Sequence, residues 1–329
     1  KAFGVPRIQV AYADQLPYID NVSDIVVVLG KLPIDEFSND TNFVNLEYTR
    51  ELSVYSDSKF YAPKLTYVKT LTLSDNSAAD LPALKSAEEI TLSISAKLKA
   101  NKLDDVSSLW AYEYAELYAP NLTVIKDSAN IKLGAKLTLP KLRTADSLYF
   151  KTASSDSPGA YKPDVANSVR PNTNMKFSFP SLETVGRFIA DNNVTLDFPE
   201  LKSAVSFNVK ATKSISIPKL KKVRNLSVLY TLLESPALST IDILDVSNAT
   251  IDLPKLSGTL TTIRIENSEV VLPNIEEATH ISVSKGALLL LPNITVVKSY
   301  IHISNASTLM MPEVDFISGD IELQKGSSI

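Results

Sequence analysis

The stretch that decides the fold runs from Pro199 to Ile217 and reads Pro-Glu-Leu-Lys-Ser-Ala-Val-Ser-Phe-Asn-Val-Lys-Ala-Thr-Lys-Ser-Ile-Ser-Ile. Apolar and polar residues alternate over 206–209 and again over 214–217. This pattern predicts two short strands, each with one apolar and one polar face. Leu201 and Ala204 are expected to line the corner between them, and Pro218 begins the same phrase again. The stretch is therefore expected to be one coil of a repeat.

The repeated phrase is an apolar residue followed by Pro-x-Leu or a close variant, and it recurs roughly every 19 residues, with a spacing of about 18 to 20 or about twice that. Its prolines are Pro63, Pro82, Pro120, Pro140, Pro180, Pro199, Pro218, Pro236, Pro254, Pro273, Pro292 and Pro312. The first double-length gap holds a degenerate copy, Asn101-Lys102-Leu103. One repeat period before Pro63, the sequence Val44-Asn45-Leu46 is another degenerate copy.

This regularity predicts an all-β, right-handed parallel β-helix, a solenoid of about 14 short coils of roughly 19 residues over residues 44–329. Stacked coils bury an apolar face that no single coil could bury alone. Proline is tolerated at the corner, because its missing N–H falls outside the ladders there. Residues 1–43 do not follow the pattern and are expected to form an N-terminal cap. A loop insertion of Ser, Pro, Gly and Asn chemistry interrupts one coil at about 153–174.

Composition narrows the function classes. The 329 residues carry a net charge of −4, which gives no electrostatic case for a nucleic-acid partner. The apolar run at 25–29 is far too short for a transmembrane segment. The absence of cysteine excludes disulfides and cysteine metal sites, and neither a metal site nor a cofactor is expected.

Asn-x-Ser/Thr sequons are unusually frequent and fall on predicted turns or outward positions, which favours a secreted glycoprotein, although a Ser/Thr-rich bacterial surface protein would look similar. The candidate glycosylation residues are Asn21, Asn39, Asn121, Asn193, Asn225, Asn248, Asn293 and Asn305.

The Pro-x-Leu corner followed by an outward-polar strand, at this short period and without helices, resembles the receptor L-domain type of β-solenoid, a leucine-rich-repeat-like design. That family includes ligand-binding lobes of growth-factor receptors, fungal cell-wall glycoproteins and surface proteins of gut bacteria. The resemblance implies an extracellular, cell-surface or cell-wall protein with a non-catalytic role in adhesion, ligand binding or wall organisation. The chain lacks the disulfides common in receptor members, which argues against a growth-factor-receptor role.

An enzyme is the main alternative, because polysaccharide lyases and hydrolases also use β-helices. Such a site needs convergent carboxylates on one sheet face. Asp242 and Asp245 could approach one another on a coil, and His280 and His302 are expected in neighbouring coils, offset by about two positions. No third catalytic member accompanies them, so no catalytic residue is predicted and a non-enzymatic function is favoured.

A binding surface has more support. The central outward position of the first strand is polar in most coils, but it is Trp110 and Tyr149 in two of them. Exposed aromatic rings beside polar groups suit stacking on sugars or packing against a protein. The candidate ligand-binding residues, for a glycan or a surface protein, are Trp110, Tyr112, Tyr114, Tyr149, Tyr161 and Arg187. Alternatively, the 153–174 insertion folds down and simply covers Trp110 and Tyr149.

The outward position of the second strand becomes apolar late in the chain, at Val271, Leu290 and Met310. Three stacked outward apolar residues predict a covered surface. Either a following C-terminal segment packs there or a second copy does, so self-association into a structural or filament subunit is the alternative function.

Overall fold

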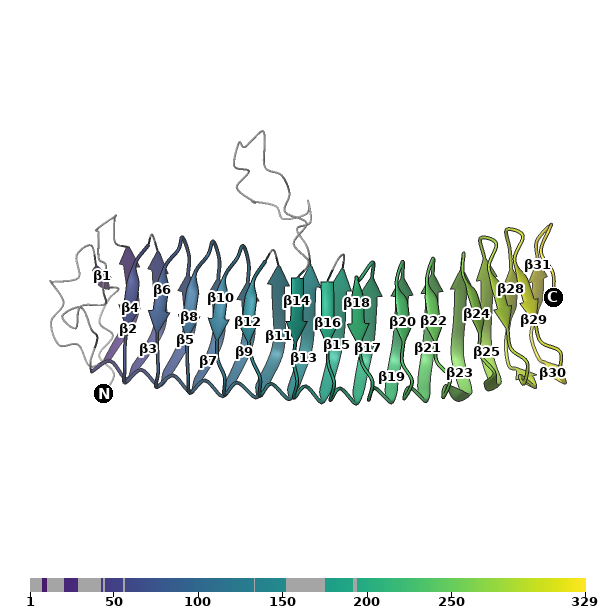
Figure 1. Cartoon of the computed structure of the whole chain (residues 1–329), viewed down its shortest axis with the longest axis horizontal. Helices are drawn as coiled ribbons and strands as arrows, with labels where there is room; N and C mark the ends of the chain where they lie inside the picture. The colour runs from purple at the N-terminus through teal and green to yellow at the C-terminus, as the bar shows by residue number, and fades with distance from the viewer. Residues whose placement is uncertain are drawn as a thin grey trace, which may run out of the picture. The chain divides into compact units, whose positions relative to one another are not determined.

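The computed structural model describes residues 8–10, 21–28, 43, 45–55, 57–132, 134–151, 175–191 and 194–329. These residues form a parallel β-solenoid of about 13 turns, about 19 residues apart, with no helix among them (Figure 1). The expected all-β parallel solenoid is confirmed. Two units divide the chain, residues 1–179 and 180–329, and each is a stack of coils.

A coil consists of one long and one short strand. In the stretch quoted first, these are β17 (Ser203–Lys210) and β18 (Ser214–Ser216). The alternation of apolar and polar residues predicted both strands. β17 begins three residues earlier than the pattern at 206–209 indicated. Phe207 and Val209 point inward and are fully buried, while Asn208 between them is partly exposed.

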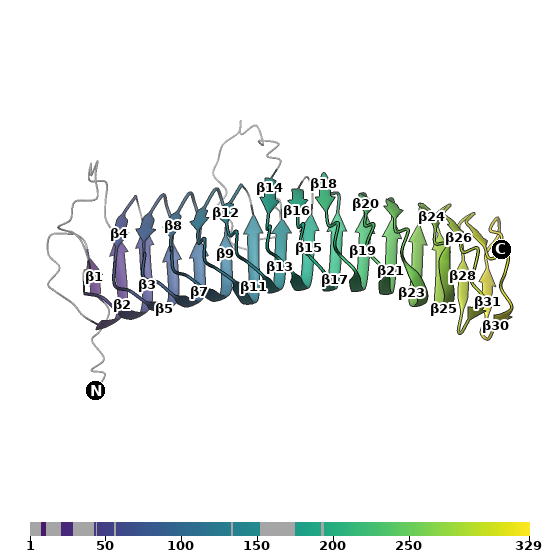
Figure 2. The same ribbon diagram turned by 60° about the horizontal axis from the view of Figure 1, so that its bottom comes forward.

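In the first unit the long strands pair in parallel with their copies in the next coil (Figures 1 and 2). The long strands are β1 (Ile8–Val10), β2 (Asn21–Val28), β3 (Tyr48–Tyr55), β5 (Tyr67–Leu73), β7 (Ser86–Leu92), β9 (Asp105–Ala111), β11 (Val124–Lys132) and β13 (Thr144–Lys151). The short strands are β4 (Lys59–Tyr61), β6 (Ala78–Asp80), β8 (Lys97–Lys99), β10 (Glu116–Tyr118), β12 (Lys136–Thr138) and β14 (Met175–Ser178). Residues of one register therefore form columns, alternately buried and exposed, that run from coil to coil.

The second unit repeats this arrangement. Besides β17, its long strands are β15 (Thr184–Asp191), β19 (Lys222–Leu229), β21 (Thr240–Ser247), β23 (Ser257–Glu266) and β25 (Asn274–Ser284), followed by the split pairs β27 (Val296–Val297) with β28 (Ile301–Ile303) and β30 (Phe316–Ile317) with β31 (Ile321–Leu323). Besides β18, its short strands are β16 (Val194–Asp197), β20 (Leu232–Glu234), β22 (Thr250–Asp252), β24 (Glu269–Val271), β26 (Leu288–Leu290) and β29 (Thr308–Met310).

The Pro-x-Leu phrase forms a tight turn at one corner of the coil. The Leu65 N–H donates to the Ala62 carbonyl at 3.3 Å, with Pro63 at the second position of the turn, where its fixed φ is favoured. The degenerate copies make the same turn without proline: Leu103 N–H donates to Ala100 and Leu46 N–H to Phe43, both at 3.2 Å. The expectation that these two stretches are genuine coils is therefore confirmed.

Proline at Asn101 is expected to stabilise the protein. The residue occupies the place that proline takes in the turn at Pro63, and the substitution removes conformational freedom from the unfolded chain, which is worth about 0.4–1 kcal/mol. Urea unfolding of Asn101→Pro should show that gain. The matched control is Lys102→Pro, one position later in the turn, where proline is disfavoured and stability should fall. A loss of stability in Asn101→Pro would contradict the shared turn geometry.

The opposite corner turns through positive φ angles, mostly at residues other than glycine. Glu113 and Tyr114 have φ of 49° and 67°, and Tyr230 has 50°. Stacked backbone hydrogen bonds hold this corner, as when the Tyr230 N–H donates to the Ser247 carbonyl of the next coil at 3.1 Å. Because bulky residues rarely adopt such angles, the sequence carries little signal for this corner.

Differences in coil length are absorbed by bulges. The pairings of β11 shift register between Ile125 and Ser128, and the pairing of β23 with β25 shifts after Gly258. A bulge adds a residue to one strand and leaves the inward columns on either side aligned.

The stretch 1–43, expected as a cap, contributes β1 and β2 to the solenoid. Ile25 of β2 pairs with Leu52 of β3, and Ile8 of β1 pairs with Ile25, all in parallel. The stacked ladder therefore continues into residues before the predicted boundary at 44. The insertion at 153–174, including Tyr161, lies outside the described residues, as does Asn39.

Candidate functional site

An outward column of the first unit carries the candidate site. Thr72, Thr91, Trp110, Asn130 and Tyr149 are aligned in register across β5, β7, β9, β11 and β13. This is the column that alternation predicted. Trp110, Asn130 and Tyr149 are each partly exposed. We call these three residues the aromatic column.

Trp110 is partly exposed and contacts another aromatic ring of its own coil. Its ring centroid lies 6.1 Å from that of Tyr112, at an interplanar angle of 55°. Its indole Nε1 is buried and has no hydrogen-bond partner among the described residues. Burying an unpaired N–H costs free energy.

The ring of Tyr112 is partly buried and contacts a lysine of the next coil. The Lys132 ammonium lies over its ring, 5.1 Å from the centroid. Burial, with a smaller contribution from the Glu89 carboxylate, raises the pKa of Tyr112 to about 12. The phenol is therefore neutral at physiological pH, and one ring face already has a cation on it.

Tyr114 is more exposed, at 48%, and lies at the left-handed corner. Its ring covers Gly134 of the next coil, where an added Cβ would lie 2.6 Å from the ring. Tyr118, on β10, is 46% exposed. Tyr118 was not among the predicted site residues, although alternation along 116–118 places it outward.

The remaining predicted binding residue is Arg187, which is exposed on β15 and pairs in register with Ser206 in the second unit. The four aromatic candidates other than Tyr161 all belong to the first unit. Trp110, Tyr112 and Tyr114 come from a single coil, and Tyr149 lies two coils further along.

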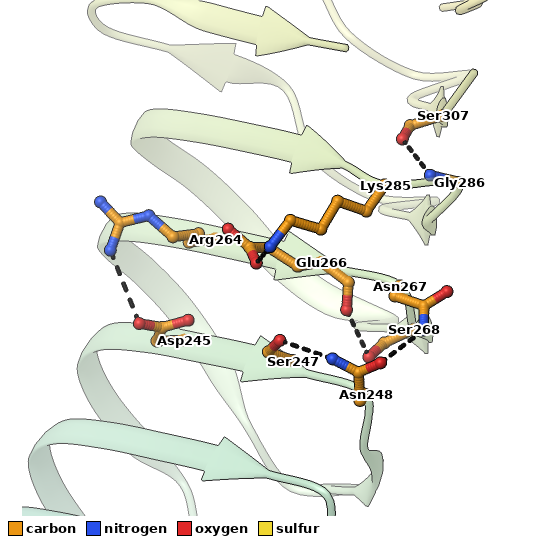
Figure 3. A network of polar contacts seen from close by, with 10 residues as sticks. All are labelled: Asp245, Ser247, Asn248, Arg264, Glu266, Asn267, Ser268, Lys285, Gly286 and Ser307. Carbon is orange, nitrogen blue, oxygen red and sulfur yellow. Dashed lines mark hydrogen bonds and ion pairs between the residues drawn. The ribbon is translucent and has the colours of Figure 1, made fainter. Parts of the chain in front are cut away.

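The two acidic candidates for an enzyme, Asp242 and Asp245, form ion pairs with different arginines; Figure 3 shows the pair of Asp245 with Arg264. Asp245 pairs with Arg264 at 3.5 Å, and Asp242 pairs with Arg224 at 3.6 Å and accepts a hydrogen bond from Thr261. Burial raises the pKa of Asp245 above its ordinary value, although Arg264 opposes the shift. Among the described residues no group of three or more His, Asp or Glu side chains could hold a metal ion.

The rest of the network in Figure 3 ties the coils of the second unit together. Lys285 donates to Glu266 at 2.6 Å, and Asn267 donates to the side chain of Asn248 at 2.5 Å. Ser268 donates to the Glu266 carbonyl at 2.8 Å. Since these bonds join residues at equivalent positions of successive coils, or lie within one turn, they serve the stack itself.

The two histidines lie apart, as the sequence predicted. His302 pairs in register with Ser282, two residues beyond His280 on the neighbouring strand. His302 Nδ1 lies 3.0 Å from the Glu322 carboxylate, and His280 meets the ring of Tyr300 edge-on at 5.8 Å.

The predicted apolar column of the second unit is present. Val271 pairs with Leu290 and Leu290 with Met310 across β24, β26 and β29. Val271 is 53% exposed and Met310 49%, with Leu290 partly exposed between them. None of the described residues covers this column, which is thus open to a partner.

The described sequon asparagines differ in their surroundings. Asn305 is exposed, Asn293 is exposed but donates to the Pro273 carbonyl at 2.7 Å, and Asn248 is partly exposed at the corner of positive φ. Asn121 donates to the Asn101 carbonyl at 2.6 Å, and the Asn225 side-chain oxygen is buried within β19. The side chains of Asn21 and Asn193 lie outside the described residues.

No family model, no curated protein and no solved structure matches the chain. Across the described ranges, no helix has the length and hydrophobicity needed to traverse a lipid bilayer.

Proposed function

We propose that the protein is a non-catalytic binding module of the cell surface or cell wall, and that the aromatic column binds a glycan. The observation that carries this proposal is the alignment of Trp110, Asn130 and Tyr149 in one outward column. Ring faces that alternate with an amide match the apolar faces and hydroxyl edges of sugars. The parallel ladders hold these side chains on a rigid sheet, so little ordering would be required on binding.

Two further observations support a place outside the cell. The coil design resembles the receptor L-domain type of solenoid, whose members act at surfaces and in walls. Asn293 and Asn305 present exposed sequons, and the chain contains no cysteine that oxidation could affect. The proposal therefore includes secretion of the protein and glycosylation of Asn293 and Asn305.

An array of plant, fungal and bacterial polysaccharides tests the proposal. The full chain should bind at least one glycan. Trp110→Ala and Tyr149→Ala should each lose about 1–2 kcal/mol or more of binding free energy, as central aromatic contacts do. The matched control is Tyr118→Ala, which removes a more exposed aromatic ring from the short strand β10, outside the aromatic column, and should bind normally. Capture of a protein in place of any glycan, or binding unchanged in both variants, would contradict the proposal.

A second function is favoured by the exposed column of Val271, Leu290 and Met310. Solvent-exposed apolar side chains stacked in register are a typical contact surface between protein chains. We infer that this column joins two copies into a structural assembly, so that substitution of its middle member, Leu290, should prevent association.

A further inference from the structure

The aromatic side chains around Trp110 differ in how much of their rings a ligand could use. The Lys132 ammonium covers Tyr112, and the ring of Tyr114 lies on Gly134. Trp110 contacts the ring of Tyr112 only at a tilt, and no described ring or ammonium stands over Tyr149. Trp110 and Tyr149 are therefore the two rings of this group without such a cover, and both belong to the aromatic column. A ligand that uses both must cross coils, because Trp110 and Tyr149 lie two coils apart in the column.

The register fixes the distance between these two rings. Trp110 pairs with Asn130, and Asn130 with Tyr149, so two strand spacings separate them, which is about 10 Å. Rings of an extended oligosaccharide two sugars apart are separated by a similar length. Asn130 lies halfway, where its amide can hydrogen-bond the intervening sugar.

Charge is distributed unevenly on either side of the column. Lys132 and Lys151 follow Asn130 and Tyr149 by two residues on the same strand faces, and they pair with each other in register. Neither has a carboxylate partner among the described residues. On the other flank, Lys126 is paired with Asp105, and Ser108 donates to Asp127 at 3.0 Å.

We propose that the ligand is an extended acidic oligosaccharide that lies across β9, β11 and β13, stacks on Trp110 and Tyr149, and places its carboxylates beside Lys132 and Lys151. This inference rests on the proposed function and adds the direction and the charge of the ligand. Carboxylates of the ligand would give Lys132 and Lys151 the counter-charges that the described residues do not supply, and the sugar rings would bury the exposed parts of Trp110 and Tyr149.

Calorimetric titration of the full chain with three probes tests the inference. The probes are hexagalacturonic acid, digalacturonic acid and the neutral cellohexaose. The acidic hexamer should bind at least about 10-fold more tightly than either other probe. Lys132→Gln/Lys151→Gln should bring the acidic hexamer to the level of cellohexaose, and added salt should weaken only the acidic probes. Tyr149→Ala should abolish the advantage of the hexamer over the dimer.

The control variant is Lys97→Gln/Lys136→Gln, in which the two lysines flank Glu116 on the short strands and should not affect binding. Equal binding of cellohexaose and hexagalacturonic acid through Trp110 would overturn the inference and leave the proposed function standing. Equal binding of dimer and hexamer would overturn the proposed direction. If neither hexamer binds, the inference fails, whereas the polysaccharide array decides the proposed function independently.

Discussion

Phe188→Ala is expected to lower the free energy of unfolding by about 3–5 kcal/mol. Phe188 is fully buried in the second unit, stacked on Phe207 of the next coil with ring centroids 4.6 Å apart at 15°. It also meets Phe198 edge-on at 5.3 Å. Truncation removes both ring contacts and leaves a cavity that rigid ladders on either side cannot close. Urea unfolding monitored by circular dichroism measures the loss.

Phe188→Leu is the matched control, because it keeps a branched apolar side chain in the same column and should cost much less than alanine. In a stack of coils, stability depends on contacts between nearest neighbours. Hydrogen exchange in Phe188→Ala should therefore rise first in β15 and β17, and later in β25. A loss below about 1 kcal/mol would show that the aromatic stack is not a main source of stability in this unit.

Much of this core could be predicted from the sequence. The period of about 19 residues and the alternation at Phe207 and Val209 indicate which residues face inward. The turn at Leu103 could be located without its proline, because its leucine remains in phase. The outward column from Thr72 to Tyr149 follows from the same alternation.

Other features depend on interactions between coils and leave no local signal. Tyr230 adopts a positive φ because backbone hydrogen bonds to the next coil fix the corner, whereas its own preference is against it. The pairing of β2 with β3 was missed because Leu16-Pro17-Tyr18-Ile19, a variant of the phrase within residues 1–43, is out of step with the period of the later coils and was not counted as a coil. The bulge after Ile125 changes the spacing between paired residues of β11 and β13 from 20 to 19, and this shift cannot be located from the sequence pattern alone.

The candidate site was predictable to the same extent. Alternation identified Trp110 and Tyr149 as outward aromatics, but it could not distinguish them from Tyr112 and Tyr114. That distinction depends on two residues of the next coil, about 20 positions later in the sequence. Lys132 lies over the ring of Tyr112, and Gly134 lies against the ring of Tyr114. Only the register between neighbouring coils reveals which of these rings have a covered face.

Leu290→Asp is expected to abolish self-association. Leu290 is the middle member of the exposed column, with Val271 and Met310 in register on either side. Burying side chains of this kind is worth about 1.5–3 kcal/mol each, and a two-fold interface uses every member of the column twice. A carboxylate at the centre would have to lose its hydration without a partner, which opposes association.

Sedimentation equilibrium over a range of protein concentrations measures this effect. The unsubstituted chain should associate reversibly, and Leu290→Asp should remain monomeric with an unchanged circular dichroism spectrum. Ser216→Asp is the matched control, because residue 216 is the corresponding outward position of β18 in a coil where the neighbouring residue of that column is Asp197. A new carboxylate there meets water and should leave association intact. A chain that stays monomeric at every concentration would argue against the column as an interface between copies, and association that persists in Leu290→Asp would place the interface elsewhere.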